Sequence, residues 1–151
     1  MPTPPVSTTN APNGEQEGVR PAEGYAGDVT PACAARWVAE GNAVLVDVRT
    51  DAEREWVGYV PGAIGLAWKQ WPGMALNPDF DEGIRAATTG GRKLVLLCRS
   101  GVRSIAAAKR ATELGAQAYN ILEGFEGNPD AQGHRGRAGG WRFHGLPWKQ
   151  N

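Results

Sequence analysis

Cys98 is the residue of this sequence best placed to carry out covalent chemistry. It follows the apolar run 93–97, which predicts a buried strand, and it precedes an Ala-rich helix expected from about Ser104 to Leu114. In open α/β sheets, ligand sites form at the carboxyl ends of the strands. Backbone amides in such a turn and the amino terminus of the next helix both favour an anion. The position therefore predicts that Cys98 is a reactive nucleophile.

The residues that follow Cys98 have the composition that a thiolate site requires. Two arginines supply positive charge, which favours a cysteine thiolate over the thiol, and a glycine allows a tight turn. The candidate active-site loop consists of Arg99, Ser100, Gly101, Val102, Arg103 and Ser104. The simpler alternative is that Cys98 is a small apolar residue at the end of a strand. Packing alone does not explain the two arginines and the glycine, so we favour the functional interpretation.

The elements around this loop alternate between strands and helices. Thr30 and Pro31 are typical of a helix start, and the apolar run 43–46 predicts a parallel strand. Thr50 and Glu53 have the spacing of a capping box, which predicts a short helix. Further helices and strands are expected over 77–87, 93–97, 104–114 and 118–122, with a short strand near residue 64. Such alternation is typical of a parallel sheet with helices on both faces.

Size and composition exclude several classes of protein. The chain has 151 residues, no net charge and 41% hydrophobic residues, so no basic surface for nucleic acid is expected. The apolar runs are too short to span a bilayer, and residues 1–20 lack a secretory signal, so we expect a cytoplasmic protein without a membrane partner. Two cysteines are too few for a disulfide framework, and His134 and His144 lack metal-ligand spacing. No metal or organic cofactor is predicted.

The domain organisation predicted from composition is simple. Residues 1–24 are rich in Pro, Thr, Asn, Gly and Glu, and they are expected to form a flexible tail. Residues 25–151 are expected to form one domain. The Gly-rich segment 127–139 has little periodicity and is interpreted as a long surface insertion.

The motifs in this order resemble the rhodanese family of sulfurtransferases, from about Tyr25 to Trp148. The resemblance is carried by Asp47-Val48-Arg49 with Glu53, Val60-Pro61-Gly62-Ala63, the loop from Cys98 to Ser104, Asn120-Ile121-Leu122-Glu123-Gly124-Phe125, and Gly145-Leu146-Pro147. It implies a single rhodanese-like α/β domain with a five-stranded parallel sheet flanked by helices. It also implies that Asp47, Arg49 and Glu53 support the loop without taking part in the chemistry.

The resemblance further implies a ping-pong sulfurtransferase. Cys98 would take sulfane sulfur from a small donor such as thiosulfate or a persulfide, and an acceptor such as cyanide or a thiol would remove it. Residues Arg99 to Ser104 would cradle the sulfur through their amides, while Arg99 and Arg103 would hold an anionic donor. Because the loop is not the Cys-Arg-Lys-Gly-Val-Thr form of thiosulfate enzymes, the choice of donor stays open.

Two alternatives use the same cysteine. A sulfur carrier or redox-sensing module would discharge its persulfide only to a protein acceptor. A cysteine phosphatase or arsenate reductase would require an arginine six positions after the cysteine, where this sequence has Ser104. Arg103 comes one position earlier, and the shorter loop suits a smaller sulfur centre, so the phosphatase is the weaker alternative.

Overall fold

The apolar runs of the sequence form the centre of a six-stranded sheet in the computed structural model, which describes residues 18–70 and 73–150. The strand order is β2-β3-β9-β8-β4-β5. These strands are β2 (Val19–Arg20), β3 (Gly27–Val29), β9 (Ala118–Ile121), β8 (Lys93–Leu97), β4 (Ala43–Asp47) and β5 (Ile64–Gly65). All neighbouring pairs are parallel except β2 with β3. The predicted α/β class is therefore confirmed.

The edge strand β2 differs from the prediction. The prediction is a tail over residues 1–24 and a sheet of five strands, whereas Val19 and Arg20 pair antiparallel with Val29 and Asp28. Residues 1–17 of the predicted tail lie outside the described residues. Val19 also packs against the core of the domain. The backbone of a short segment is ordered here by pairing with an existing edge, which its polar composition does not reveal.

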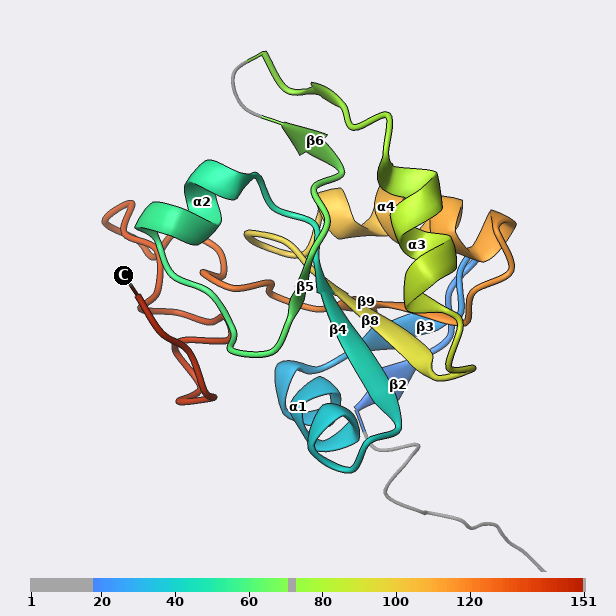
Figure 1. Ribbon diagram of the computed structural model, residues 1–151. Coiled ribbons are helices and arrows are strands. Elements are labelled where there is room, and N and C mark those ends of the chain that lie inside the picture. Colours follow the sequence, from blue (N-terminus) through green and yellow to red (C-terminus); the bar gives the residue numbers. More distant parts are fainter. Residues whose placement is uncertain (1–17, 71–72, 151) are drawn as a thin grey trace, which may run out of the picture.

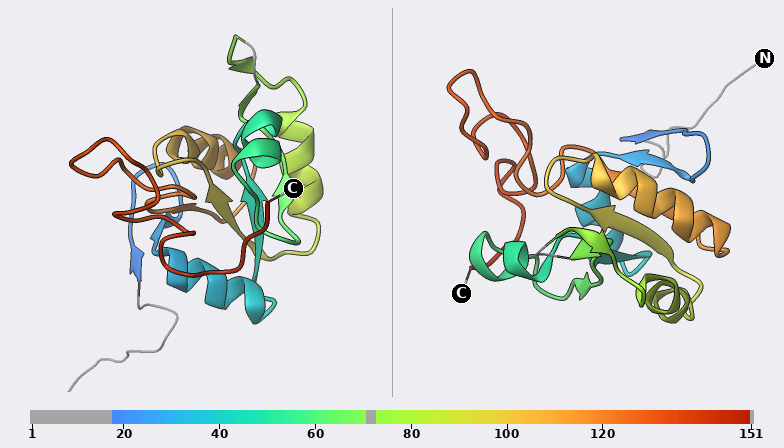
Figure 2. Two further views of the ribbon diagram at one scale, coloured as in Figure 1. Left: turned by 90° about the vertical axis from the view of Figure 1, so that its left-hand side faces the viewer. Right: turned by 90° about the horizontal axis from the view of Figure 1, so that it is seen from above.

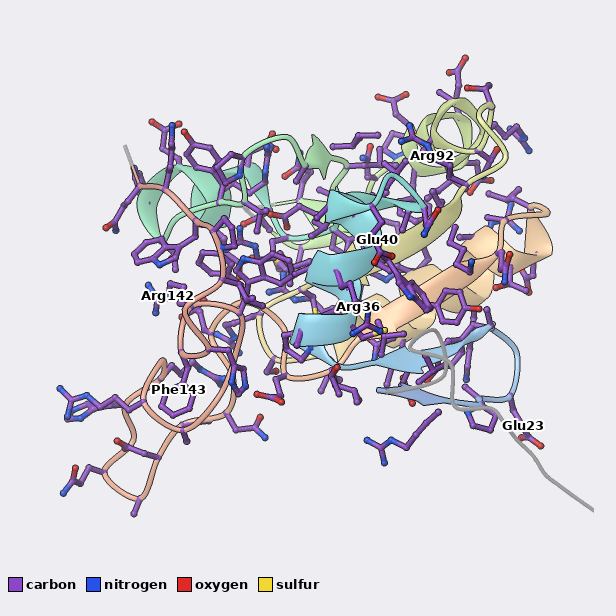
Figure 3. All side chains as sticks on the ribbon, turned by 90° about the horizontal axis from the view of Figure 1, so that it is seen from below. Glu23, Arg36, Glu40, Arg92, Arg142 and Phe143 are labelled. Atoms are coloured by element: carbon purple, nitrogen blue, oxygen red, sulfur yellow. The ribbon has the colours of Figure 1, made fainter. Side chains whose placement is uncertain are left out.

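Helices cover both faces of the sheet (Figure 1). Helix α1 (Pro31–Ala39) packs on one face, while α3 (Phe80–Ala87) and α4 (Arg103–Glu113) pack on the other. Figure 3 shows α1, which carries Arg36 and is followed by Glu40, crossing its face of the sheet. The Thr30 side chain caps α1, with Pro31 in its first turn, as predicted. Helix α2 (Asp51–Trp56) begins with the predicted capping box of Thr50 and Glu53.

The sheet separates two apolar cores. One contains Trp37 of α1, Phe125 and Trp141 together with inward-facing residues of the strands. The other contains Ile84 of α3 and the alanines Ala107, Ala108 and Ala111 of α4. The small alanine side chains allow α4 to lie close to β8 and β9, and this contact places the amino terminus of α4 beside the end of β8.

Two segments extend beyond the layers (Figures 1 and 2). A hairpin of β6 (Lys69–Gln70) and β7 (Ala75–Leu76) stands at the same end of the molecule as α2. The predicted Gly-rich insertion, residues 127–139, projects from the body as a loop without helix or strand. The chain then returns, and Tyr59 and Lys149 form a bridge. Within the described ranges, no helix is both long and apolar enough to cross a bilayer.

Candidate active site around Cys98

Cys98 lies directly after β8, with its side chain turned into the loop that leads to α4. The residue is 1% exposed, and the backbone N–H of Gly101 donates a hydrogen bond to its Sγ at 3.1 Å. The Cys98 carbonyl accepts from the Phe125 N–H at 2.7 Å, which ties the loop to the segment after β9. The sulfur therefore sits at the carboxyl end of a central strand, facing an amide donor and the start of α4.

Gly101 has a backbone conformation that this loop requires. Its φ is +93°, a value that other residues rarely adopt, and an added Cβ would lie 3.0 Å from the Glu123 backbone nitrogen. Glycine therefore allows the loop to pass close to the segment after β9. This path directs the Gly101 amide to the sulfur.

A cavity of about 470 Å³ gives access to the loop. Its lining consists of Met74, Cys98, Arg99, Ser100, Val102 and Arg103. Five of these residues come from the predicted loop, whereas Met74 comes from the β6–β7 hairpin and was missed. Met74 has a φ of +53°, and nothing in the sequence around it indicated that it would face a cysteine 24 positions later.

The two arginines of the loop have different environments. Arg103 donates to both carboxylate oxygens of Glu53, at 2.8 and 2.7 Å. Arg99 is exposed, and within residues 18–70 and 73–150 its guanidinium has no hydrogen bond or ion pair. Arg99 is thus the arginine available to an anionic ligand, while Arg103 links the loop to α2.

This ion pair affects the protonation of both partners. Burial alone raises the pKa of Glu53, but the hydrogen bonds and charge of Arg103, with the hydrogen bonds of Thr50, outweigh it, so the pKa lies below its usual value. The hydrogen bonds to Glu53 raise the pKa of Arg103 above its ordinary value despite partial burial. Both groups are consequently charged across the physiological range.

Asp47 and Arg49 form a second, fully buried ion pair next to the loop. Arg49 donates to both Asp47 oxygens, at 2.9 and 2.7 Å, and to the Gly58 carbonyl at 2.7 Å. Its guanidinium lies 4.2 Å from the centre of the Phe125 ring. The amide of the same Phe125 donates to the Cys98 carbonyl, so the Asp47–Arg49 pair is connected to the loop through Phe125. Neither residue of the pair lines the cavity.

A chain of polar side chains extends from the sulfur into the sheet, which sequence reasoning missed as a functional feature. Ser104 Oγ lies 3.2 Å from Cys98 Sγ and donates to Asn120 Oδ1. Asn120 Nδ2 donates to Asp28 Oδ1 at 2.9 Å, and the Tyr25 hydroxyl donates to the same oxygen at 2.8 Å. The available signal was Asn120 itself, a polar residue inside an otherwise apolar strand.

The remaining chemistry-bearing residues lie elsewhere. Cys33 belongs to the core on the α1 face, whereas Cys98 belongs to the core on the α3–α4 face. His144 contacts Glu123 at 2.8 Å, beyond the Gly-rich insertion. Across the described residues, no three His, Cys, Asp or Glu side chains form a group able to hold a metal ion.

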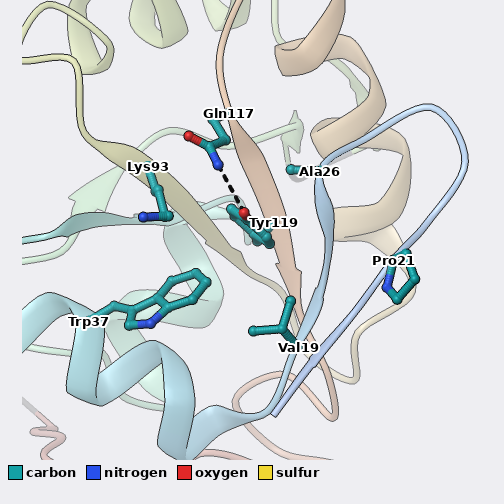
Figure 4. Close-up of a pocket in the computed structure, with 7 residues that line it drawn as sticks. All are labelled: Val19, Pro21, Ala26, Trp37, Lys93, Gln117 and Tyr119. Atoms are coloured by element: carbon teal, nitrogen blue, oxygen red, sulfur yellow. Dashed lines mark hydrogen bonds between the residues drawn. The ribbon is translucent and has the colours of Figure 1, made fainter. Parts of the chain in front are cut away.

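A second cavity, of about 550 Å³, has no residue of the Cys98 loop in its lining (Figure 4). It is lined by Trp37, Lys93 and Tyr119 among others, and Gln117 donates to the Tyr119 hydroxyl there. Lys93 is the first residue of β8, so this cavity lies at the amino end of the strand that Cys98 follows. Sites of open α/β sheets form at the opposite edge.

Several known proteins are similar to this chain in fold and in sequence. The family model of the rhodanese-like domain matches residues 30–128. The crystal structure of Rv0390 from M. tuberculosis has 44% sequence identity and a TM-score of 0.77, over 84% of this chain and 99% of that one. An uncharacterized protein of Rickettsia conorii, RC0915, is 36% identical over 74% of this chain and 87% of its own length.

An activity has been suggested for a third similar protein. A Rhodopseudomonas palustris protein of unknown function, described as a possible tyrosine phosphatase, has 27% identity and a TM-score of 0.52 over 81% of this chain and 83% of its own. The family match covers the segment from the cap of α1 through β9 and includes the Cys98 loop. The chain belongs to the rhodanese-like family.

Proposed function

We propose that this protein is a sulfurtransferase that carries sulfane sulfur as a persulfide on Cys98. The observation that supports this most directly is the placement of Cys98 Sγ against the Gly101 amide, on the wall of a cavity that also exposes Arg99. An amide donor and the amino terminus of α4 favour a thiolate. A small donor would reach the sulfur through this cavity.

The reaction has two displacement steps. The Cys98 thiolate attacks the outer sulfur of the donor, forming a sulfur–sulfur bond as the donor's own sulfur–sulfur bond breaks. With thiosulfate the electron pair leaves on sulfite, and Cys98 becomes a persulfide anion. An acceptor such as cyanide or a thiolate then attacks the outer sulfur, and the electron pair returns to Cys98 as the thiolate.

The loop residues have distinct roles in this scheme. The exposed Arg99 guanidinium binds the anionic end of the donor. Among the amides between Arg99 and Ser104, that of Gly101 supplies the hydrogen bond that reaches Sγ. Arg103, engaged by Glu53, keeps the loop in position and adds positive charge.

Intact-protein mass after incubation with thiosulfate tests the covalent step. The wild-type chain is expected to gain one sulfur atom and to lose it again on addition of cyanide. Cys98→Ser is expected to gain nothing. Cys33→Ser is the matched control, since it removes the other buried thiol and should still gain the sulfur. A gain that survives in Cys98→Ser, or disappears in Cys33→Ser, would contradict the proposal.

A protein acceptor is the second candidate, favoured by exposed apolar residues in the loop and in the hairpin that supplies Met74. Val102 is 69% exposed in the loop, and Leu76 is 59% exposed in the nearby hairpin that supplies Met74. Exposed apolar residues around a reactive site suit a protein surface better than a small anion. Turnover with excess thiosulfate and cyanide separates the two: an enzyme cycles, whereas a carrier loads once and stops.

Phosphatase activity is not proposed. The sixth position after Cys98 is Ser104, which is buried and contacts the sulfur. The arginine at the fifth position is paired with Glu53 through two hydrogen bonds. The free guanidinium of the loop, that of Arg99, directly follows the cysteine, so an oxyanion would find no free guanidinium at the fifth or sixth position after Cys98.

A further inference from the structure

The polar chain of Ser104, Asn120, Asp28 and Tyr25 restricts where the hydrogen next to Cys98 can lie. The Asp28 carboxylate has no hydrogen to donate, so the Asn120 atom that faces it at 2.9 Å must be Nδ2. Asn120 consequently presents its carbonyl oxygen, Oδ1, to Ser104. Because that oxygen also has no hydrogen, the single hydroxyl hydrogen of Ser104 is used in the bond to Asn120.

This orientation of the Ser104 hydroxyl determines which hydrogen bond it can form with Cys98. Once its hydrogen points to Asn120, Ser104 Oγ offers only lone pairs to Cys98 Sγ, 3.2 Å away. A Cys98 thiol satisfies this arrangement by donating its own hydrogen to Ser104. A thiolate does not, because the Ser104 hydroxyl would have to turn toward the sulfur and leave Asn120 Oδ1 without a donor. Asn120 is 1% exposed and Ser104 is fully buried, so water does not replace the lost bond.

We propose that Asn120, oriented by Asp28, is a positioning residue that opposes ionisation of Cys98 by holding the Ser104 hydroxyl away from the sulfur. The Gly101 amide and the start of α4 favour the thiolate, and the polar chain acts against them. The pH at which Cys98 becomes nucleophilic thus depends on the balance between the loop donors and the polar chain. This inference rests on the proposed function only in its consequence for sulfur transfer, because the ionisation itself can be measured without any sulfur donor.

Asp28 is supported as the fixed end of the chain by its second contact. The Tyr25 hydroxyl donates to the same Asp28 oxygen, at 2.8 Å. Burial, followed by this hydrogen bond and the charge of Asp28, raises the pKa of Tyr25 to about 12. Tyr25 therefore remains a donor throughout the range in which a thiol titrates, and Asp28 remains an acceptor from both neighbours.

The charged groups around Cys98 must be separated from this effect. Arg99 and Arg103 flank the sulfur in the loop, Glu53 of α2 pairs with Arg103, and Asp47 at the end of β4 pairs with Arg49. All of them favour or oppose the thiolate through their charge. A change at Asn120 leaves every one of these charges in place, so its effect reports the hydrogen-bond pattern alone.

The test is the rate of Cys98 alkylation by iodoacetamide as a function of pH, in a Cys33→Ser background that leaves one thiol. Asn120→Leu has a similar volume but no acceptor for Ser104, whose hydroxyl is then free to donate to the thiolate. We expect the midpoint of the pH profile to fall by about one unit, which is roughly a tenfold faster reaction at pH values below the midpoint. Asn120→Val, which suits a strand, serves the same purpose if leucine impairs folding.

Two further variants separate hydrogen bonding from charge. Asp28→Asn allows the Asn120 amide to reverse and donate to Ser104, so the midpoint should also fall; loss of a negative charge would contribute in the same direction. Tyr25→Phe keeps Asp28 an acceptor and should leave the midpoint unchanged. A fall in Asp28→Asn without one in Asn120→Leu or Asn120→Val would indicate charge alone and overturn the proposal.

The outcome is independent of sulfur transfer. If wild type is alkylated with the expected dependence on Asn120 but gains no sulfur from thiosulfate, the proposed function fails and the positioning role stands. If the wild-type chain transfers sulfur and Asn120→Leu leaves the midpoint unchanged or raises it, the proposed function stands and the positioning role fails. Where both hold, the pH profile of sulfur transfer should shift with the alkylation profile.

Discussion

Arg103 and Glu53 form a bidentate ion pair that joins the Cys98 loop to helix α2. The two residues are 50 positions apart, and their hydrogen bonds measure 2.8 and 2.7 Å. Glu53 also completes the capping box of α2 with Thr50. One carboxylate therefore stabilises the start of a helix and the position of the active-site loop, so its removal should affect both.

Glu53→Gln should lower the free energy of unfolding by about 1–2 kcal/mol, since charge-assisted hydrogen bonds are lost at a site only about one-fifth exposed. Urea denaturation at neutral pH measures the difference. Glu55→Gln, on the exposed side of the same helix, is the matched control and should change little. Equal effects of the two substitutions would show that the ion pair contributes nothing.

The free energy of unfolding should also depend on pH through the Glu53 carboxylate. Because the pKa of Glu53 is lower in the folded state than its ordinary value of 4.5, its contribution to stability is present above that value and is lost as pH falls through the lower, folded-state pKa. The wild-type free energy of unfolding should thus decline more steeply below pH 4.5 than that of Glu53→Gln. Parallel curves for the two proteins in urea titrations at several pH values would contradict this.

Asp47→Ala should be the most destabilising of these substitutions. It leaves the fully buried Arg49 guanidinium without its carboxylate, and breaking a buried pair in this way costs about 3–5 kcal/mol. Asp79→Ala, which removes an exposed carboxylate that makes no cap bond to α3, is the control. Thermal or urea unfolding followed by circular dichroism provides the comparison. A loss as small as that of Asp79→Ala would refute the structural role of the pair.

Arg99→Ala should weaken the use of anionic donors. The exposed guanidinium has no partner among the described residues, so its loss should raise KM for thiosulfate roughly tenfold, the effect of about 1.4 kcal/mol. The free energy of unfolding should not change. Arg92→Ala, in the exposed loop before β8, removes an equal charge at the opposite end of that strand from Cys98 (Arg92 is labelled in Figure 3). An equal rise in KM for both variants would indicate a general charge effect rather than a donor contact.

Gly101→Ala should disturb the sulfur environment directly. A side chain at φ +93° is strained, and its Cβ would press on the Glu123 backbone nitrogen at 3.0 Å. We expect a loss of about 1–2 kcal/mol of stability and a marked loss of persulfide formation. Gly90→Ala, where only the Arg92 side chain lies within 4 Å, is the control. Full persulfide formation in Gly101→Ala would show that the amide is dispensable.

The local pattern of this sequence was sufficient to predict most of its elements. Thr30, Pro31, Thr50 and Glu53 form the helix starts that their types predict, because caps depend on contacts within one turn. The apolar run at 93–97 forms β8 with the predicted bounds. Cys98 could be recognised because a strand, a glycine turn and a helix are consecutive in the chain, and their joint geometry is local.

Contacts between distant segments were decided only by the tertiary structure. Met74 of the β6–β7 hairpin lines the Cys98 cavity, and Arg103 forms an ion pair with Glu53. Val19 and Arg20 join the sheet through backbone pairing. The alignment of Ser104, Asn120 and Asp28 requires α4, β9 and β3 to be adjacent at a particular register. Such contacts depend on how whole elements pack, which residue type and local spacing do not specify.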